Sequence, residues 1–93
     1  MKSLKTSFAA LLIGLSSFSF ACTEEIVLDN VQAIRSYLQM RPYATDTLEG
    51  IHNYWLQSND TLDCTLLSLQ LLENSKVVER IRIGRTILWR RKI

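Results

Sequence analysis

The sequence has few of the residues from which catalytic and metal-binding sites are built. Its 93 residues include one histidine, two cysteines and three glycines. The glycines, Gly14, Gly50 and Gly84, are scattered, so the chain has no glycine-rich phosphate loop. The single histidine, His52, has no nearby thiolate and no pattern of carboxylate partners, and we expect it on a helix surface. These absences predict a protein that is not an enzyme and that binds no metal or cofactor.

The two cysteines, Cys22 and Cys64, are too few for a metal site. Without a cluster of histidines they cannot fill the tetrahedral shell of a zinc ion. An even pair in an oxidising compartment predicts a disulfide instead. The bridge would close a loop of about 40 residues and stabilise the fold by about 3–4 kcal/mol. Lipidation of Cys22 is the less favoured alternative, because Ser19 and Phe20 fit poorly the residues that precede a lipid-modified cysteine.

The N-terminus has the three parts of a secretory signal peptide. A short basic start precedes an uncharged, mostly apolar run over residues 8–20. Ser19 and Ala21 provide small residues at the −3 and −1 positions of a cleavage site. The apolar run is shorter than the roughly 20 residues of a bilayer span. We therefore predict a signal peptide over residues 1–21 and an exported domain over residues 22–93, periplasmic or secreted, with no integral membrane span.

Charge is distributed unevenly along the predicted mature chain. Residues 22–75 contain two basic and eight acidic residues, a net charge of −6. Residues 76–93 contain seven basic residues and one acidic residue, a net charge of +6. A basic tail on an acidic body indicates either an anionic partner or packing of the tail against the protein's own acids.

Apolar periodicity and capping residues predict three helices. The first covers about 24–40, because Thr23 precedes two acids in its first turn and Pro42 ends it. The other two begin at a repeated Asp-Thr-Leu-acid tetrapeptide, at Asp46–Glu49 and Asp60–Asp63. Two copies of one tetrapeptide therefore mark two helix starts.

The acids of these tetrapeptides are predicted to have a structural role. Asp46 is expected to cap a helix over about 46–57, with Glu49 bonding back to the cap residue. Asp60 is expected to cap a helix over about 61–73 in the same way. Capping explains these carboxylates better than a role in ligand binding or in acid–base chemistry.

Residues 77–91 alternate between apolar and charged residues on both sides of Gly84, which predicts a β-hairpin. Glycine at the turn supplies the positive φ that a two-residue hairpin loop requires. A shifted turn is the alternative and would exchange the cross-strand partners. The register centred on Gly84 pairs Ile81 with Leu88, Glu79 with Arg90, and Arg80 with Trp89 in a cation–π contact.

Three short helices followed by a basic hairpin resemble a winged-helix domain, over roughly residues 25–91. The second and third helices would form its helix-turn-helix, and the hairpin would be its wing. Residues 41–56 (RPYATDTLEGIHNYWL) are also similar to a small, uncharacterised bacterial family with a P-x-A-x-D-T-x-E-G-I motif and a Trp before an aliphatic residue. The resemblance implies an α+β fold, mostly helical with a C-terminal hairpin, and it implies no activity. The matching positions are Pro42, Ala44, Asp46, Thr47, Glu49, Gly50, Ile51, Trp55 and Leu56.

The basic hairpin is the best candidate for a binding surface. We predict an exported, non-enzymatic interaction module whose partner is an acidic protein or an anionic surface of the cell envelope. The alternative for the same residues is a solvated sheet face that protects an exposed edge from aggregation. The candidate contacts are Arg80, Arg82, Arg85, Arg90, Arg91 and Trp89.

A cytosolic winged-helix protein that contacts DNA phosphates non-specifically through its wing is the alternative function. In helix-turn-helix proteins, the second helix of the pair reads base edges in the major groove. Here that helix, about 61–73, has no Arg or Lys and carries Asp63 and Glu73. Phosphate would repel these acids, so specific DNA readout is not expected.

Overall fold

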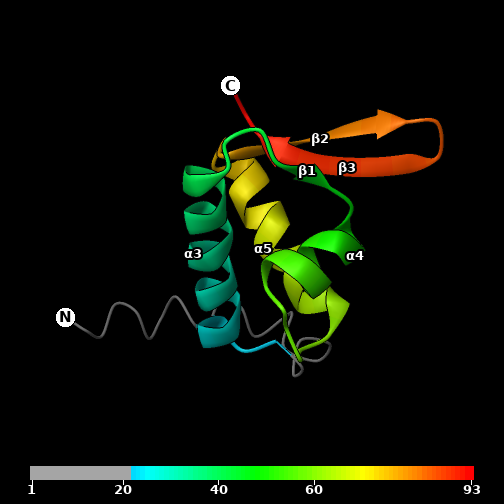
Figure 1. Cartoon of the computed structure of the whole chain (residues 1–93). Helices are drawn as coiled ribbons and strands as arrows, with labels where there is room; N and C mark the ends of the chain where they lie inside the picture. The colour runs from blue at the N-terminus through cyan, green and yellow to red at the C-terminus, as the bar shows by residue number, and fades with distance from the viewer. Residues whose placement is uncertain (1–21) are drawn as a thin grey trace.

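A computed structural model describes residues 22–93, and the predicted signal peptide, residues 1–21, lies outside the described residues. In chain order the described part contains helix α3, strand β1, a short helical segment formed by α4 and the π-helix η1, helix α5, and strands β2 and β3 (Figure 1). The fold is mixed α+β, with helices and one small antiparallel sheet of three strands.

Helix α3, Glu24–Met40, covers the range predicted from the sequence. Thr23 caps it, since the hydroxyl oxygen of Thr23 accepts a hydrogen bond from the N–H of Ile26 at 3.1 Å. Two acids occupy the first turn, where they meet the positive end of the helix dipole. The buried residues of α3 are Val27, Asn30, Ile34 and Leu38.

The second predicted helix, about 46–57, is replaced by three short elements. Strand β1 is Thr45–Asp46, helix α4 is Leu48–Gly50, and the π-helix η1 is Ile51–Trp55. The prediction was wrong here because a two-residue strand is too short to show alternation. A single π-helical turn likewise leaves no recognisable period in the sequence.

The threonines of the repeated tetrapeptides occupy the cap positions, and the predicted caps Asp46 and Asp60 do not. Thr47 Oγ1 accepts a hydrogen bond from the N–H of Gly50 at 3.1 Å. Asp46 lies in β1 instead, and its carboxylate accepts from the N–H of Thr47 at 2.8 Å. Asp46 thus lies one residue before the cap, so the capping box predicted between Asp46 and Glu49 does not form.

Helix α5, Leu62–Asn74, begins directly after Thr61, which makes no side-chain cap hydrogen bond. Asp60 lies one residue earlier, in the preceding turn, and its N–H donates to Ser58 Oγ at 2.9 Å. Thr47 and Thr61 both have the extended backbone of an N-cap residue, with φ −78°. The repeat therefore marks two helix starts as predicted, but each cap lies one residue later.

Strands β2, Val78–Ile83, and β3, Thr86–Arg91, form the predicted hairpin, and the turn glycine Gly84 has φ 64°. Strand β1 adds a third strand that the sequence analysis does not predict, antiparallel to β3, in the order β1-β3-β2. The register centred on Gly84 is confirmed: Ile81 pairs with Leu88, Glu79 with Arg90, and Arg80 with Trp89.

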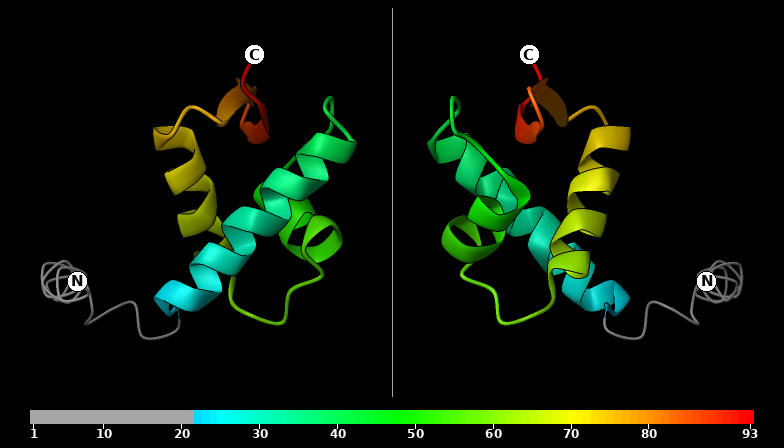
Figure 2. Two further views of the ribbon diagram at one scale, coloured as in Figure 1. Left: turned by 90° about the vertical axis from the view of Figure 1, so that its left-hand side faces the viewer. Right: turned by 90° about the vertical axis from the view of Figure 1, so that its right-hand side faces the viewer.

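The helices surround the main core, a smaller buried cluster of Cys22, Val27 and Cys64 lies beside it, and the sheet lies across one end of the helices (Figures 1 and 2). The predicted Cys22–Cys64 disulfide is present, with its two Cα atoms 5.3 Å apart. It lies near the N-termini of α3 and α5, at the end of the helices opposite the sheet (Figure 1). The core contains Ile34, Leu38, Ile51, Leu69, Leu72, Val78 and Trp89.

Candidate anionic-partner interface

The arginine hairpin, residues 78–91, has two parts with different surroundings. Its base, residues 78–80 and 89–91, lies over the ends of the helices, whereas its tip, residues 82–87, extends beyond them (Figure 1). Val78 and Trp89 in the base are buried, and every residue of the tip is exposed. The base belongs to the folded body, and the tip is available to a partner.

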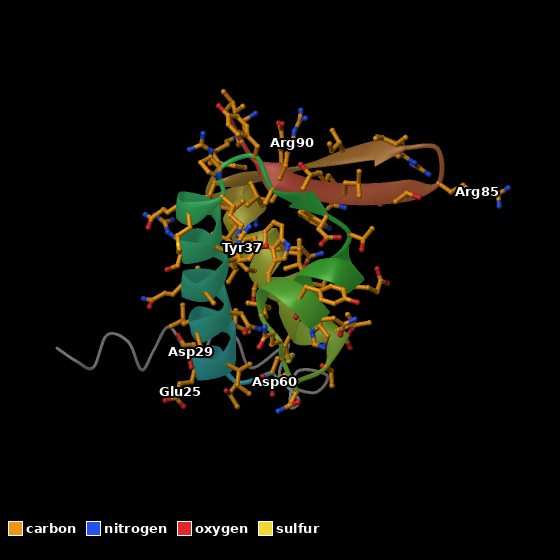
Figure 3. All side chains as sticks on the ribbon, in the orientation of Figure 1. Glu25, Asp29, Tyr37, Asp60, Arg85 and Arg90 are labelled. Atoms are coloured by element: carbon orange, nitrogen blue, oxygen red, sulfur yellow. A yellow bond between two sulfur atoms is a disulfide. The ribbon has the colours of Figure 1, made fainter. Side chains whose placement is uncertain are left out.

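Two arginines of the base are ion-paired with the protein's own acids. Arg80 donates through Nε and Nη2 to the two carboxylate oxygens of Glu73 in α5, at 2.9 and 2.8 Å. Arg90 donates through Nε to Glu79 at 2.8 Å, and Figure 3 shows Arg90 on the side of the sheet away from the helices. Lys92 Nζ is 3.8 Å from the same Glu79 carboxylate. Arg80, Arg90 and Lys92 are therefore engaged by acids of the protein itself.

The contact between Arg80 and Glu73 is bidentate, and it shifts the pKa of both side chains. Its hydrogen bond lowers the pKa of Glu73 and raises the pKa of Arg80. The Arg80 guanidinium also lies over the Trp89 ring, 4.7 Å from the ring centroid, which confirms the predicted cation–π contact. Arg80 thus links β2 to α5 through its ion pair with Glu73, and it packs on the buried Trp89.

The other three arginines of the hairpin, Arg82, Arg85 and Arg91, form no ion pair with any residue that the structure describes. Arg82 Nε donates to the backbone carbonyl of Gly84 at 3.4 Å, which does not neutralise its charge. Figure 3 shows Arg85 pointing away from the end of the hairpin. Of the predicted arginine contacts, these three have no ion-paired acid within residues 22–93.

Trp89 is not accessible to a partner, although the sequence analysis includes it among the contacts. Its side chain is 3% exposed and forms part of the core. Ile83 and Ile87, which the sequence analysis passes over, are 62% and 39% exposed. Both residues lie in the tip, close to the turn at Gly84. Closeness to the turn is the sequence signal that could have identified them as exposed. The tip therefore combines exposed apolar side chains with free arginines.

The outer surface of α5 has the wrong chemistry for reading DNA. Asp63, Leu67, Leu71 and Asn74 are exposed along it. Helix α5 has no Arg or Lys anywhere in its sequence. An exposed face made of leucines, an acid and an amide offers phosphate no attraction.

His52 is buried, in contrast to the predicted surface position. Its Nδ1 lies 2.7 Å from Thr65 Oγ1 of α5, so the imidazole is held by a hydrogen bond inside the protein. The wider turn of η1, in which the N–H of Leu56 donates to the carbonyl of Ile51 at 2.9 Å, changes which side chains of the segment point inward. His52 therefore has a structural partner inside the protein.

A shallow pocket of about 90 Å³ lies between the C-terminal half of α3 and the base of the sheet. The residues that line it are two apolar ones, Leu38 and Val77, and three polar ones, Arg35, Gln39 and Arg91. This pocket is not predictable from the sequence, because its two arginines are 56 positions apart in the chain. Only the docking of the sheet on α3 brings them to one place.

Within residues 22–93, no group of three or more His, Cys, Asp or Glu side chains could hold a metal ion. In the same part of the chain, none of the helices has the length and apolar character needed to cross a membrane. The chain matches no protein family model, no curated protein and no solved structure. The resemblances to a winged-helix domain and to the bacterial family of residues 41–56 therefore stay predictions.

Proposed function

We propose that the protein is an exported, non-enzymatic interaction module with a winged-helix-like architecture. The tip of the arginine hairpin binds an acidic protein or an anionic surface of the cell envelope. The observation that carries this proposal is the difference between ion-paired and unpaired arginines in one hairpin. Arg80 and Arg90 have acidic partners, while Arg82 and Arg85 are exposed in the tip and form no ion pair with a residue that the structure describes.

Unpaired guanidinium groups at a projecting tip are suited to anionic partners. A guanidinium presents a rigid fork of donors that matches carboxylate and phosphate groups. Arg82 and Arg85 are exposed, so an approaching partner does not have to break an internal ion pair. Ile83 and Ile87 add apolar contact area beside the charges. A surface of this kind favours a partner that combines negative charge with apolar groups.

Two structural features support the remaining parts of the proposal. The Cys22–Cys64 disulfide is of the kind that persists in oxidising compartments outside the cytosol. The order of helices followed by a hairpin supports the winged-helix-like architecture. Contact of the tip arginines with DNA phosphates is the second candidate function, favoured by the same free charges. The chemistry of the α5 surface supports only non-specific contact of that type.

Export is tested by the N-terminus of the protein recovered from its host. Fractionation followed by mass spectrometry is expected to find a chain that begins at Cys22 in the envelope or secreted fraction. An intact chain beginning at Met1 in the cytosol would contradict export and would favour the DNA-binding alternative.

Binding is tested by comparing three anionic surfaces at several salt concentrations. The protein is mixed with phosphatidylglycerol vesicles, with an acidic peptide on beads and with duplex DNA, and phosphatidylcholine vesicles serve as the neutral control. We expect binding to the vesicles or to the peptide, none to the neutral control, and weakening as salt screens the charges. Binding to DNA alone would replace the proposed function by the second candidate.

A further inference from the structure

Two cationic residues line the pocket between α3 and the sheet. Arg35 comes from the second half of α3 and Arg91 from the end of β3, and both line the pocket. Neither forms an ion pair with a described residue. The acids of α3 lie in its first six residues, and the last of them, Asp29, is about 9 Å along the helix axis from Arg35.

The surroundings of this pair leave its charge uncompensated. Glu79 is the acid of the hairpin, and it is already engaged by Arg90 and Lys92. The C-terminal end of α3 also lies at the pocket, and its negative dipole end is worth less than one full charge, so two guanidinium groups outweigh it. The net character of the pocket is cationic. Two cationic side chains that line one pocket favour an anion there.

The apolar residues of the pocket indicate which kind of anion would fit it. Leu38 is 2% exposed and Val77 is half-buried, and both residues line the pocket. A carboxylate matches the guanidinium fork, and an aliphatic group next to it would cover the Leu38 and Val77 side chains. Sites for whole drug-sized ligands measure roughly 300–1,000 Å³. A pocket of about 90 Å³ holds only the end group of a ligand.

We propose that this pocket binds a carboxylate carried on a short aliphatic group. A small branched carboxylic acid and the C-terminal residue of a polypeptide both present that chemistry. Arg35 and Arg91 bind the carboxylate, and Leu38 and Val77 contact the aliphatic group. The inference goes beyond the proposed function: it depends on Arg35, which lies outside the hairpin, and it does not use the tip arginines. Each proposal can therefore fail without the other.

An NMR titration of the full chain tests this inference. The probes are isovalerate, the peptide acetyl-Gly-Gly-Leu with a free carboxylate, the same peptide as its amide, and inorganic phosphate. The two carboxylates are expected to shift the Leu38 and Val77 methyl signals saturably, in the millimolar range of affinity expected for an open site, and the amide is expected to shift neither. Tighter binding of the peptide than of isovalerate assigns a polypeptide terminus as the source, and equal binding assigns a small acid.

Matched arginine variants identify the site of binding. Arg35→Gln is expected to weaken both carboxylates by about tenfold or more, a loss of about 1.4 kcal/mol or greater, and Arg85→Gln is expected to leave them unchanged. An unaltered methyl spectrum before titration shows that Arg35→Gln is folded. Shifts that do not saturate, equal binding of phosphate, or equal weakening by Arg85→Gln would each overturn the proposal. None of these results bears on binding by the hairpin tip.

Discussion

The base and the tip of the hairpin contain the same residue types but have different surroundings. At the base, Val78 and Trp89 are buried, and Arg80 is bound by the Glu73 carboxylate. At the tip, Ile87 and Arg85 are exposed and have no such partner among the described residues. The difference arises because the helices end beneath the base. A count of arginines therefore overstates the charge that a partner can use.

The comparison also separates stability from binding. Buried apolar area and internal ion pairs lie at the base, so substitutions there should alter the free energy of unfolding. The tip contributes little buried area, so substitutions there should alter binding while the fold remains intact.

Replacing the tryptophan of the base should have the largest effect on stability. Trp89→Ala removes a large buried side chain and is expected to lower the free energy of unfolding by about 3–5 kcal/mol. Ile87→Ala, two residues away in the same strand but at the tip, is expected to change it by about 0.5 kcal/mol or less. Urea unfolding followed by circular dichroism measures both. Similar losses for the two variants would contradict the division between base and tip.

Loss of the disulfide should destabilise the protein from the end opposite the hairpin. The double variant Cys22→Ser/Cys64→Ser is expected to lose about 2–4 kcal/mol, because the bridge spans a sequence separation of 42 residues. Under conditions where this variant is still folded, its binding to phosphatidylglycerol vesicles should match that of the wild type. A loss of binding by the folded variant would show that the far end of the helices controls the tip.

The ion pair of the base should give a smaller effect that depends on pH. Because Arg80 lowers the pKa of Glu73, the pair stabilises the fold fully above the pKa of an unfolded glutamate. This contribution is lost as pH falls through the lower pKa of the folded state, and for an exposed pair it amounts to about 1 kcal/mol at most. Carbon-13 NMR of the Glu73 carboxyl measures the titration. Arg80→Gln should raise the Glu73 pKa, whereas Arg82→Gln should not change it.

Several features of the fold were predictable because they depend on local chemistry. Gly84 with alternating residues around it sets the hairpin register, and the register in turn identifies the contact between Arg80 and Trp89. The disulfide followed from two cysteines in a chain with a predicted export signal. The pairing of two strands joined by a short turn and the number of cysteines can both be read directly from the sequence.

Other features depend on how distant elements dock, and the sequence does not specify them locally. The hairpin register pairs Arg80 with Trp89 but does not say which face of the sheet the helices cover, so Trp89 was wrongly predicted to be accessible. Strand β1 exists only because Thr45 and Asp46 meet β3. The Arg35 and Arg91 pocket likewise forms only when the sheet packs on α3.

The most direct test of the central claim compares two double variants that remove the same charge. Arg82→Gln/Arg85→Gln removes the unpaired arginines of the tip, and Arg80→Gln/Arg90→Gln removes the paired arginines of the base. Binding to phosphatidylglycerol vesicles and to the acidic peptide is measured for both at one salt concentration. We expect the tip variant to bind about tenfold more weakly than the wild type, a loss of about 1.4 kcal/mol, and the base variant to retain most of its affinity. Equal weakening by the two variants would mean that net charge alone governs binding, and would contradict binding by the tip.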